Sequence, residues 1–342
     1  MKFDVIRAIE ACYAPAPDDR DWLAGLLDTF GPLDEGPGFV AWVFRFVPGG
    51  SRVIECSAAS SGIPPSVRLE MDFAFDKAYE SMPPDLARRH LAPSPTVEYA
   101  LRRAIRLGPP ALEEAMRFYV QRLGAADLLG VFAGEPVGRT VLIAHGTPAG
   151  RPLLPARTLH QLTLFSAHLS SSARLRRALS DSSETVRDSP TEAVLDPRGR
   201  ILDVSGGARP KEARQSLADA VRRMDRARGA LRRADPEEAL GLWRGLVDGT
   251  WSLVDQCDSD GKRYVLARRN EPGVRDPKAL TQRERSVAAF AAMGHQNKFI
   301  GYLLGLSAGT VSEHLRSAQR KLGLSSRAAL VQWFAHLIEV GL

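Results

Sequence analysis

The chain has 342 residues, of which 44% are hydrophobic and 25% are charged. These are the proportions of folded globular domains of about 100–200 residues each, so we expect two or three domains and exclude disordered and fibrous classes. No apolar run approaches the ~20 residues that cross a bilayer, and the first residues carry charges where a signal peptide would be apolar. We therefore expect a cytoplasmic protein with no membrane contact. The three cysteines lie far apart, which argues against a disulfide framework or a CxxC metal site and predicts buried free thiols.

The excess positive charge is concentrated at the C-terminus. The whole chain has a net charge of +6. Residues 278–342 contain eight basic and three acidic residues, a net charge of +5, which leaves +1 for the other 277 residues. A small module that holds nearly all the excess positive charge has the electrostatic character of a polyanion binder.

The first segment, residues 1–178, mixes helical and strand patterns. Runs rich in β-forming residues flank turn sequences such as Pro48-Gly49-Gly50 and Gly134-Glu135-Pro136, which predicts two strand pairs. The order of helix, hairpin, helices, hairpin and long exit helix resembles that of a GAF-type sensor domain. The predicted elements are an amphipathic helix over residues 19–30, strands over residues 39–44, 52–56, 128–132 and 140–144, and a helix over residues 154–179.

The second segment, residues 190–271, lies between two polar, proline-containing linkers at residues 180–190 and 270–277. It begins with a strand, an Asp-x-x-Gly turn at residues 196–199 and a second strand, an order that resembles the entry to a PAS domain. It ends with two strand-like runs joined by an Asp-Gly step, which is a strong hairpin signal. Its length of about 80 residues is short for that family, so we expect a reduced PAS-like domain. No histidine occurs between His168 and His295, so this segment cannot hold haem through histidine.

The C-terminal module shows the pattern of four helices. Thr281 and Glu284 form a capping box at the start of the first helix, which Gly294 ends. A second helix is expected over about residues 296–304, and a tight turn containing Gly305 leads to a third helix with Ser307 as its N-cap. Two helices joined by such a turn form a helix-turn-helix, whose second helix enters the major groove of DNA.

The order LTQRE…G…NK.IG..LGLS.GTV..HL….KLG.SSRAALV resembles the LuxR-type DNA-binding domain of bacterial transcription factors. The resemblance covers about 65 residues, a fifth of the chain. Region four of sigma factors shares the turn and the GTV step but lacks KLGLSSRAALV. The sequence departs from the family at Gly301, where alanine is usual, and we expect both residues to be small enough for the close approach of the helices. Gln296 replaces the usual serine or threonine, which leaves the cap of the second helix uncertain.

The resemblance implies a recognition helix at residues 308–321. Arginine can bond to guanine O6 and N7, and glutamate can accept from cytosine N4, whereas contacts to phosphate give affinity with little specificity. For each basic residue the alternative is a solvated helix face, and His314 has no partner at metal-ligand spacing. The implied base contacts are Ser312, Glu313 and Arg316, and the implied phosphate contacts are Arg283, Lys298, Thr310, Arg320 and Lys321.

The resemblance also implies dimerisation through the last helix, residues 327–340. Its core stripe contains Leu330, Val331, Phe334, Leu337 and Ile338. Ala329, Gln332 and Trp333 lie off that stripe and are the implied dimer contacts, although Trp333 could equally complete the core of the monomer. The long helix that ends near Leu179 offers a second dimer seam.

Motifs of other functions are absent from the sequence. There is no P-loop, no HExxH and no acidic pattern of a receiver domain, and the G-x-S-x-G match at residues 305–309 follows a helix instead of a strand. We therefore predict a multidomain chain, with two α/β (α+β) sensor-like modules followed by an all-α four-helix helix-turn-helix domain. The expected function is that of a bacterial transcription regulator, a homodimer on double-stranded DNA, with no enzymatic activity, cofactor or metal.

Two alternatives remain open for residues 1–271. This region could bind or transform a small molecule as the main activity, with DNA binding as an accessory function. It could instead dock a protein such as a kinase or RNA polymerase. An enzyme would show titratable residues that converge in one cleft, a sensor would show an apolar pocket or none, and a docking module would show an exposed apolar patch. The sequence gives neither the signal, nor the operator, nor the direction of regulation.

Overall fold

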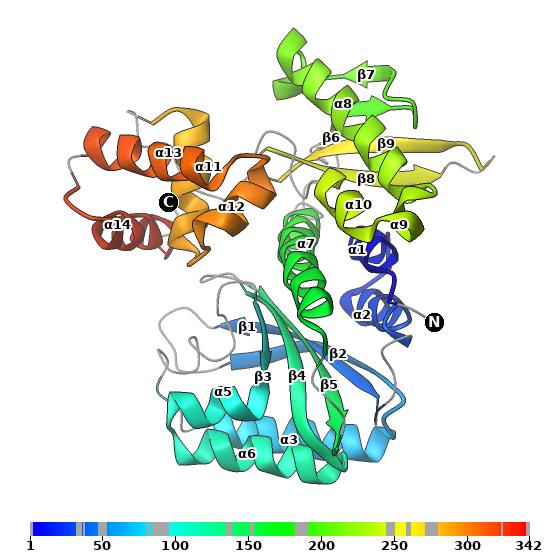
Figure 1. Ribbon diagram of the computed structural model, residues 1–342, viewed down its shortest axis with the longest axis vertical. Coiled ribbons are helices and arrows are strands. Elements are labelled where there is room, and N and C mark those ends of the chain that lie inside the picture. The colour runs from blue at the N-terminus through cyan, green and yellow to red at the C-terminus, as the bar shows by residue number, and fades with distance from the viewer. Residues whose placement is uncertain are drawn as a thin grey trace. The chain divides into compact units, whose positions relative to one another are not determined.

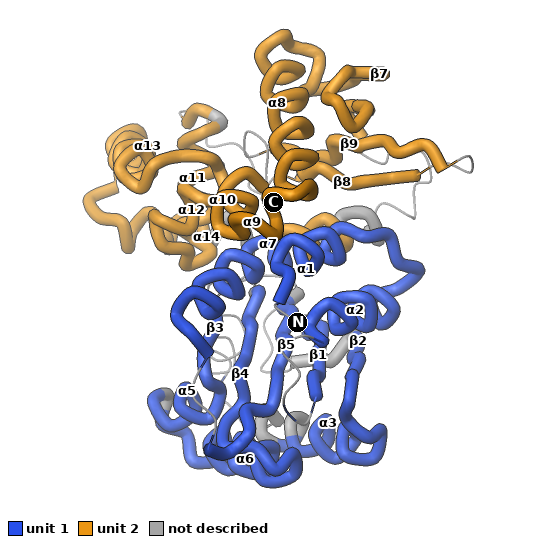
Figure 2. The backbone as a smooth tube through the Cα atoms, turned by 45° about the vertical axis from the view of Figure 1, so that its right-hand side comes forward, with its two compact units in different colours: residues 1–170 blue, residues 171–342 orange. Residues whose placement is uncertain are grey.

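A computed structural model of the chain describes residues 3–31, 36, 38–46, 53–80, 83, 96–134, 139–150, 154–181, 191–243, 250–257, 261–270, 280–322 and 324–339. It forms two compact units, residues 1–170 and 171–342 (Figure 2). Several segments named in the sequence analysis lie outside the described residues. They are most of both expected linkers, the Pro48-Gly49-Gly50 turn, Glu135-Pro136 and Lys278. No helix among the described residues is both long and apolar enough to span a membrane.

The first unit is built on an antiparallel sheet of five strands in the order β2-β1-β5-β4-β3 (Figure 1). Both expected strand pairs are confirmed, with Phe44 opposite Glu55 and Val131 opposite Ile143. The pairing of β1 with β5 joins the two hairpins into one sheet. The strands are β1 (Phe39–Phe46), β2 (Val53–Ser61), β3 (Thr96–Tyr99), β4 (Ala125–Gly134) and β5 (Arg139–Pro148).

Helices cover both faces of this sheet because its strands alternate apolar residues on the two sides. The helices α3 (Pro65–Glu80), α5 (Ala100–Leu107) and α6 (Pro110–Arg122) cover the face that carries Trp42 and Phe132. On the opposite face Phe39 packs against Phe30, whose ring meets Phe165 of the long helix α7 (Ala156–Asp181). The remaining helices of this unit are α1 (Val5–Cys12) and α2 (Asp19–Leu27).

Two helices differ slightly from their predicted bounds. Helix α2 ends at Leu27, three residues earlier than predicted, because the amides of Thr29 and Phe30 bond to carbonyls three residues back and tighten the chain into a turn. Phe30 is still buried, as its helical spacing indicated. Helix α7 begins at Ala156, directly after Pro155, and ends at Asp181, so it is displaced by two residues from the predicted range of 154–179.

The sheet of the second unit has four antiparallel strands in the order β7-β6-β9-β8. The predicted Asp-x-x-Gly turn is confirmed, because Asp196 Oδ1 accepts from the amides of Arg198 (2.9 Å) and Arg200 (2.8 Å), and Gly199 takes a φ of +81°. Cys257 is exposed, which corrects its predicted burial, whereas Cys12 is buried. The elements are β6 (Thr191–Leu195), β7 (Ile201–Val204), η3 (Gly206–Ala208), α8 (Lys211–Arg228), α9 (Leu231–Ala234), α10 (Pro236–Leu242), β8 (Trp251–Cys257) and β9 (Arg263–Arg269).

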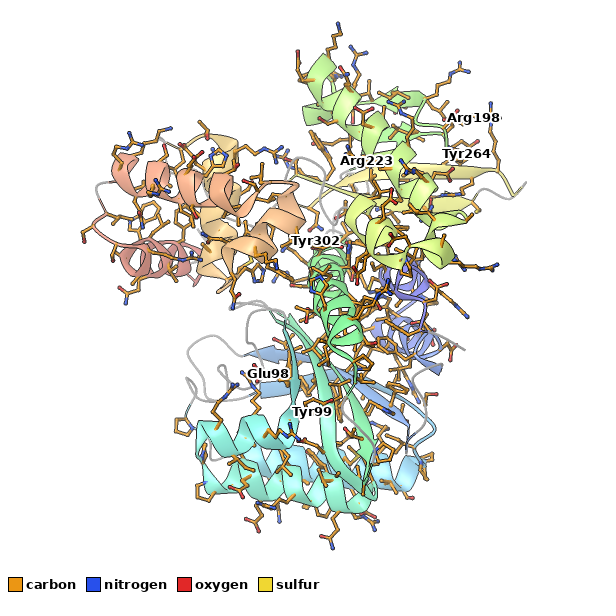
Figure 3. The ribbon with its side chains drawn as sticks, viewed as in Figure 1. Glu98, Tyr99, Arg198, Arg223, Tyr264 and Tyr302 are labelled. Atoms are coloured by element: carbon orange, nitrogen blue, oxygen red, sulfur yellow. The ribbon has the colours of Figure 1, made fainter. Side chains whose placement is uncertain are left out.

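The two sheets share one connectivity. In each, the first strand lies between the second and the last strand, and the last strand pairs with the strand that precedes it in the chain. The first sheet has one further strand, β3, which extends its edge and carries Glu98 (Figure 3). Glu98 binds Arg103 (2.7 Å) and Arg106 (2.6 Å), which ties this edge strand to helix α5.

The first unit should lose stability in acid because of His168. This side chain is fully buried on α7, and burial lowers its pKa to about 3, so the ring is neutral in the folded unit. The unfolded ring has a pKa near 6.5, so the stability that this group contributes is present above pH ~6.5 and is lost as the pH falls toward 3. His168→Gln keeps a polar partner for the Tyr13 hydroxyl, which lies 3.3 Å from His168 Nδ1, and should reduce this dependence.

Hydrogen–deuterium exchange of peptides from α1 and α7, with variant and wild type compared at each pH in urea, measures this effect. His160→Gln is the matched control, because His160 is exposed on the same helix. Equal acid sensitivity of the His168 variant and the wild type would contradict the assignment.

Candidate nucleic-acid interface

The four C-terminal helices are α11 (Gln282–Ala292), α12 (Asn297–Leu304), α13 (Ala308–Lys321) and α14 (Arg327–Glu339). Their apolar stripes meet in one core, as the periodicity predicted, although Val331 of the predicted α14 stripe is only half-buried. The side chains of Leu337 and Ile338 lie outside those that the structure describes. The buried residues of this core include Val287, Phe290, Ile300, Leu303, Leu304, Val311, Leu315, Ala318, Leu330 and Phe334.

Helix α11 begins with the predicted capping box. The Thr281 hydroxyl accepts from the Glu284 amide at 3.3 Å, and Glu284 Oε2 accepts from the Thr281 amide at 2.8 Å. The helix ends at Ala292, and Gly294 then takes the left-handed conformation that redirects the chain. Gln296 precedes α12 without a side-chain cap, so serine or threonine would add a hydrogen bond here that glutamine does not make.

A close backbone contact sets the turn between α12 and α13. Gly305 has a φ of +70°, and the Leu306 amide donates to the Gly301 carbonyl at 2.8 Å. A Cβ atom on residue 301 would lie 2.5 Å from the Leu306 carbonyl oxygen, so alanine requires this turn to open. The expectation that glycine and alanine fit equally is therefore wrong for this conformation. Ser307 then caps α13 by accepting from the Thr310 amide at 3.0 Å.

The predicted base-contacting residues differ in their surroundings. Glu313 and Arg316 are exposed on α13, and neither makes an ion pair or hydrogen bond with any residue that the structure describes. The half-buried Ser312 hydroxyl instead donates to the Ala308 carbonyl (3.0 Å) and accepts from Asn297 Nδ2 (2.7 Å). The structure thus places Glu313 and Arg316 on one open face, with Ser312 at the edge next to α12.

The predicted phosphate-contacting residues fall into two groups. Lys298, near the start of α12, and Arg320, near the end of α13, are exposed, and Arg283 on α11 is half-buried. The Thr310 hydroxyl lies 2.8 Å from Ser307 Oγ, and Lys321 Nζ lies 2.7 Å from Glu284 Oε2. Thr310 and Lys321 therefore already make hydrogen bonds within the domain. The Lys321 side chain is still 36% exposed.

Glu284 joins α11 to α13. Besides closing the capping box, its carboxylate accepts from Ser317 Oγ (2.6 Å) and Lys321 Nζ (2.7 Å). Burial acts to raise the pKa of Glu284, but the hydrogen bonds from Lys321, Ser317 and Thr281 outweigh it and lower the pKa to about 2. The sequence pattern indicates the cap but not this link between α11 and α13. Ser317 and Lys321 are four residues apart, on one face of α13, which was the available signal.

Asn297, the first residue of α12, joins this helix to α13 and α14. Its Nδ2 donates to Ser312 on α13, and its Oδ1 accepts from the Arg327 guanidinium at the start of α14. Arg327 also donates to the His295 carbonyl at 3.1 Å. No local sequence pattern indicates these roles of Asn297 and Arg327, because Ser312 lies 15 residues from Asn297 and Arg327 lies 30 residues from it in the chain.

The loop before α12 contains a buried histidine. His295 stacks on Phe290, with 5.6 Å between ring centroids, and meets Phe299 edge-on at 5.1 Å. Burial and the nearby charge of Arg174 lower its pKa to about 3, which keeps the ring neutral. On α12, the Tyr302 hydroxyl (Figure 3) donates to the Leu240 carbonyl at 3.3 Å. Within the described part of the chain, no three His, Cys, Asp or Glu residues gather as metal ligands would.

The predicted dimer contacts on α14 are partly accessible. Gln332 is exposed, whereas Ala329 and Trp333 are half-buried. The Trp333 ring meets the buried Phe334 edge-on, with 5.1 Å between centroids. Trp333 thus contacts the monomer core and still offers part of its surface.

Comparison with known proteins identifies the class of this domain. Residues 278–334 match the model of the family described as "Bacterial regulatory proteins, luxR family" (GerE). The C-terminal domain is therefore a LuxR-type helix-turn-helix domain, attached to an α+β region with two antiparallel sheets.

Individual relatives resemble different parts of the chain. YhjB of Escherichia coli (strain K12), named as an HTH-type transcriptional regulator, is 40% identical over 57 residues. That match spans 17% of this chain and 28% of YhjB. Escherichia coli SdiA aligns over 94% of this chain and 91% of its own, with 9% identity and a TM-score of 0.30. SdiA in complex with octanoyl-rac-glycerol aligns over 89% and 82%, with 11% identity and a TM-score of 0.26. Both scores lie below the level that indicates a shared fold.

Glu284→Gln should destabilise the C-terminal domain at neutral pH. Glutamine can still close the capping box but loses the charged bond to Lys321, and hydrogen bonds to charged groups contribute about 1.5–3 kcal/mol. The native pKa of about 2 lies below the unfolded value of 4.5. The contribution is therefore present above pH ~4.5 and is lost as the pH falls toward 2.

Hydrogen exchange of α11 and α13 peptides, compared between variant and wild type at pH 7 and pH 3, tests this link. Glu313→Gln is the matched control, because Glu313 is an exposed glutamate with no described partner in the same domain. A difference between Glu284→Gln and wild type that stays constant with pH would show that the Glu284 charge does not contribute.

Proposed function

We propose that this chain is a sequence-specific DNA-binding regulator of transcription that places α13 in the major groove. The observation that carries the proposal is the open face of α13, with Glu313 and Arg316 exposed in a domain that matches the luxR family. The concentration of positive charge in residues 278–342 supports it, because phosphate neutralisation supplies much of the affinity for DNA.

The side chains on α13 suit two kinds of base contact. Arg316 has the geometry to donate two hydrogen bonds to guanine O6 and N7, and Glu313 can accept from cytosine N4. Asn297 and Ala308 already hold the Ser312 hydroxyl, so Ser312 has a smaller capacity for base contact.

Phosphate contact falls first to the exposed Lys298 and Arg320. Arg283 is half-buried, and Thr310 and Lys321 would share their polar groups between DNA and the bonds they make inside the domain. A single recognition helix reads too few base pairs to distinguish one site in a genome. A homodimer would read two half-sites at a fixed spacing. Its contacts on α14 would be Ala329, Gln332 and Trp333.

The front of the chain is proposed as two sensor-like modules, GAF-like over residues 1–178 and reduced PAS-like over residues 190–271. The shared connectivity of the two sheets supports a pair of related modules. A partly open apolar cavity in the first unit, lined by Phe39, Ile143 and His145 among others, has a volume of only about 10 Å³. Ligand sites commonly have about 300–1,000 Å³, so this cavity favours neither a bound metabolite nor the alternative of a catalytic module.

Arg316→Ala should relax base preference at one position of each half-site and weaken binding to the preferred sequence by about 1–3 kcal/mol. Arg320→Ala is the matched control, because this second exposed arginine of α13 should weaken good and poor sequences alike. Arg320→Ala should also reduce the slope of log affinity against log salt concentration by about 0.9.

Selection from a random DNA pool, followed by titration at several salt concentrations, distinguishes the two variants. An unchanged motif with Arg316→Ala would disprove this register, and failure of the wild type to bind DNA at low salt would disprove the function.

Trp333→Ala should weaken cooperative binding to a two-half-site DNA while affinity for a single half-site stays within a few-fold. The reason is that Trp333 lies on α14, outside the recognition helix, and its half-buried side chain can offer part of its surface to a second domain. Titration of one-site and two-site DNA measures the difference. Equal losses on both DNAs, together with faster exchange of α14 amides, would show that Trp333 serves the monomer core instead.

A further inference from the structure

The outer face of helix α3 carries two large apolar side chains that the described part of the first unit does not bury. Leu69 is 60% exposed and Phe73 is 62% exposed, and they lie about one turn apart. Together with Ala74 on α3 and Phe118 on α6 they line an open groove of about 420 Å³. Helices α3 and α6 lie side by side on one face of the sheet (Figure 1), so the groove follows the outer surface of this helical layer.

The opposite side of α3 is fixed in place, so these residues cannot turn inward. Met71 is fully buried, and its carbonyl accepts from the Tyr119 hydroxyl at 2.8 Å. Asp72 accepts from Trp42 Nε1 at 3.0 Å and from Arg68 at 2.6 Å. Rotating α3 to cover Leu69 and Phe73 would break all of these bonds. An exposed apolar surface on such a fixed element is typical of a site that another surface covers.

The charges beside the groove are self-complementary. Glu70 and Lys77 both line it, seven positions apart, which is about 10 Å or two turns along the helix. Their midpoint falls between Phe73 and Ala74. If a second α3 crosses antiparallel at that midpoint, each Lys77 faces the Glu70 of the other copy, while the Phe73 side chains meet at the centre. A two-fold interface requires this property, because the same patch contacts itself.

Glu70 and Lys77 can take part without losing their present contacts. Glu70 already binds Arg122 Nη2 at 2.6 Å, but a carboxylate has about four acceptor positions and can bind a second cation. Lys77 Nζ lies 4.8 Å from the centroid of the Phe73 ring, so its charge is held at the rim of the groove. The small side chain of Ala74 leaves room for two helices to approach closely.

We propose that the groove formed by Leu69, Glu70, Phe73, Ala74, Lys77 and Phe118 is a homodimer interface, in which α3 packs antiparallel against α3 of a second copy of this chain. Apolar contact at Phe73 and Leu69 provides the affinity, and the two Glu70–Lys77 pairs determine orientation and partner choice. The interface lies entirely in the first unit and does not depend on DNA binding or on α14.

The first test is the oligomeric state of the full chain without DNA, measured by sedimentation equilibrium at micromolar protein. The wild type should be a dimer, and Phe73→Glu should raise its dissociation constant by at least about tenfold, because it removes the central apolar contact and sets two carboxylates against each other. Ile105→Glu is the matched control, since Ile105 is 49% exposed on α5 of the same unit but does not line the groove, and it should leave the dimer unchanged. A monomeric wild type, or a Phe73→Glu chain that dimerises normally, would overturn the proposal.

The second test uses charge reversal and does not depend on how Phe73→Glu folds. Glu70→Lys places only positive charge at both positions and Lys77→Glu places only negative charge, so each single variant should dimerise more weakly than the wild type. A mixture of the two should form a heterodimer, and the double variant Glu70→Lys/Lys77→Glu should regain self-association. Asp28→Lys, at an exposed residue of the same unit that does not line the groove, controls for net charge. Absence of a heterodimer, or of recovery in the double variant, would overturn the antiparallel pairing.

Discussion

The angle between α11 and α13 depends on the buried carboxylate of Glu284. One side chain closes the N-terminal cap of α11 and also binds two residues on consecutive turns of α13. A buried carboxylate is costly unless its acceptor positions are filled, so the three partners stabilise both the charge and the relation of the two helices. This fixed relation helps to set the direction in which the exposed face of α13 points.

Different contacts fix the relative orientation of the helices at the other helix junctions of this domain. Between α12 and α13 the backbones are in close contact, which is possible because Gly301 has no side chain. Between α12 and α14 it is an amide–guanidinium contact, through Asn297 and Arg327. Apolar packing joins all four helices but is compatible with small rotations, whereas these polar and steric contacts are specific for one geometry.

Local patterns in the sequence predicted the elements better than their long-range contacts. The capping box at Thr281, the turn at Gly305 and the two hairpins of the first unit depend on residues close in the chain, and all are found in the structure. The pairing of β1 with β5 and the bond of Lys321 to Glu284 depend on partners many residues apart, which periodicity cannot identify. Leu69 and Phe73 show the same limit, because apolar residues on a helix predict burial and only the packed structure shows that these two remain outside.

The hydrogen bonding of Ser312 has a consequence for the chemistry that its side chain can offer. A hydroxyl has one proton and two lone pairs. The proton goes to the Ala308 carbonyl, and one lone pair accepts from Asn297. A single lone pair is left, so at this position the domain can accept a hydrogen bond but has none to donate. An amino group, such as adenine N6 or cytosine N4, is compatible with that surface, whereas the O6 and N7 acceptors of guanine would face an acceptor.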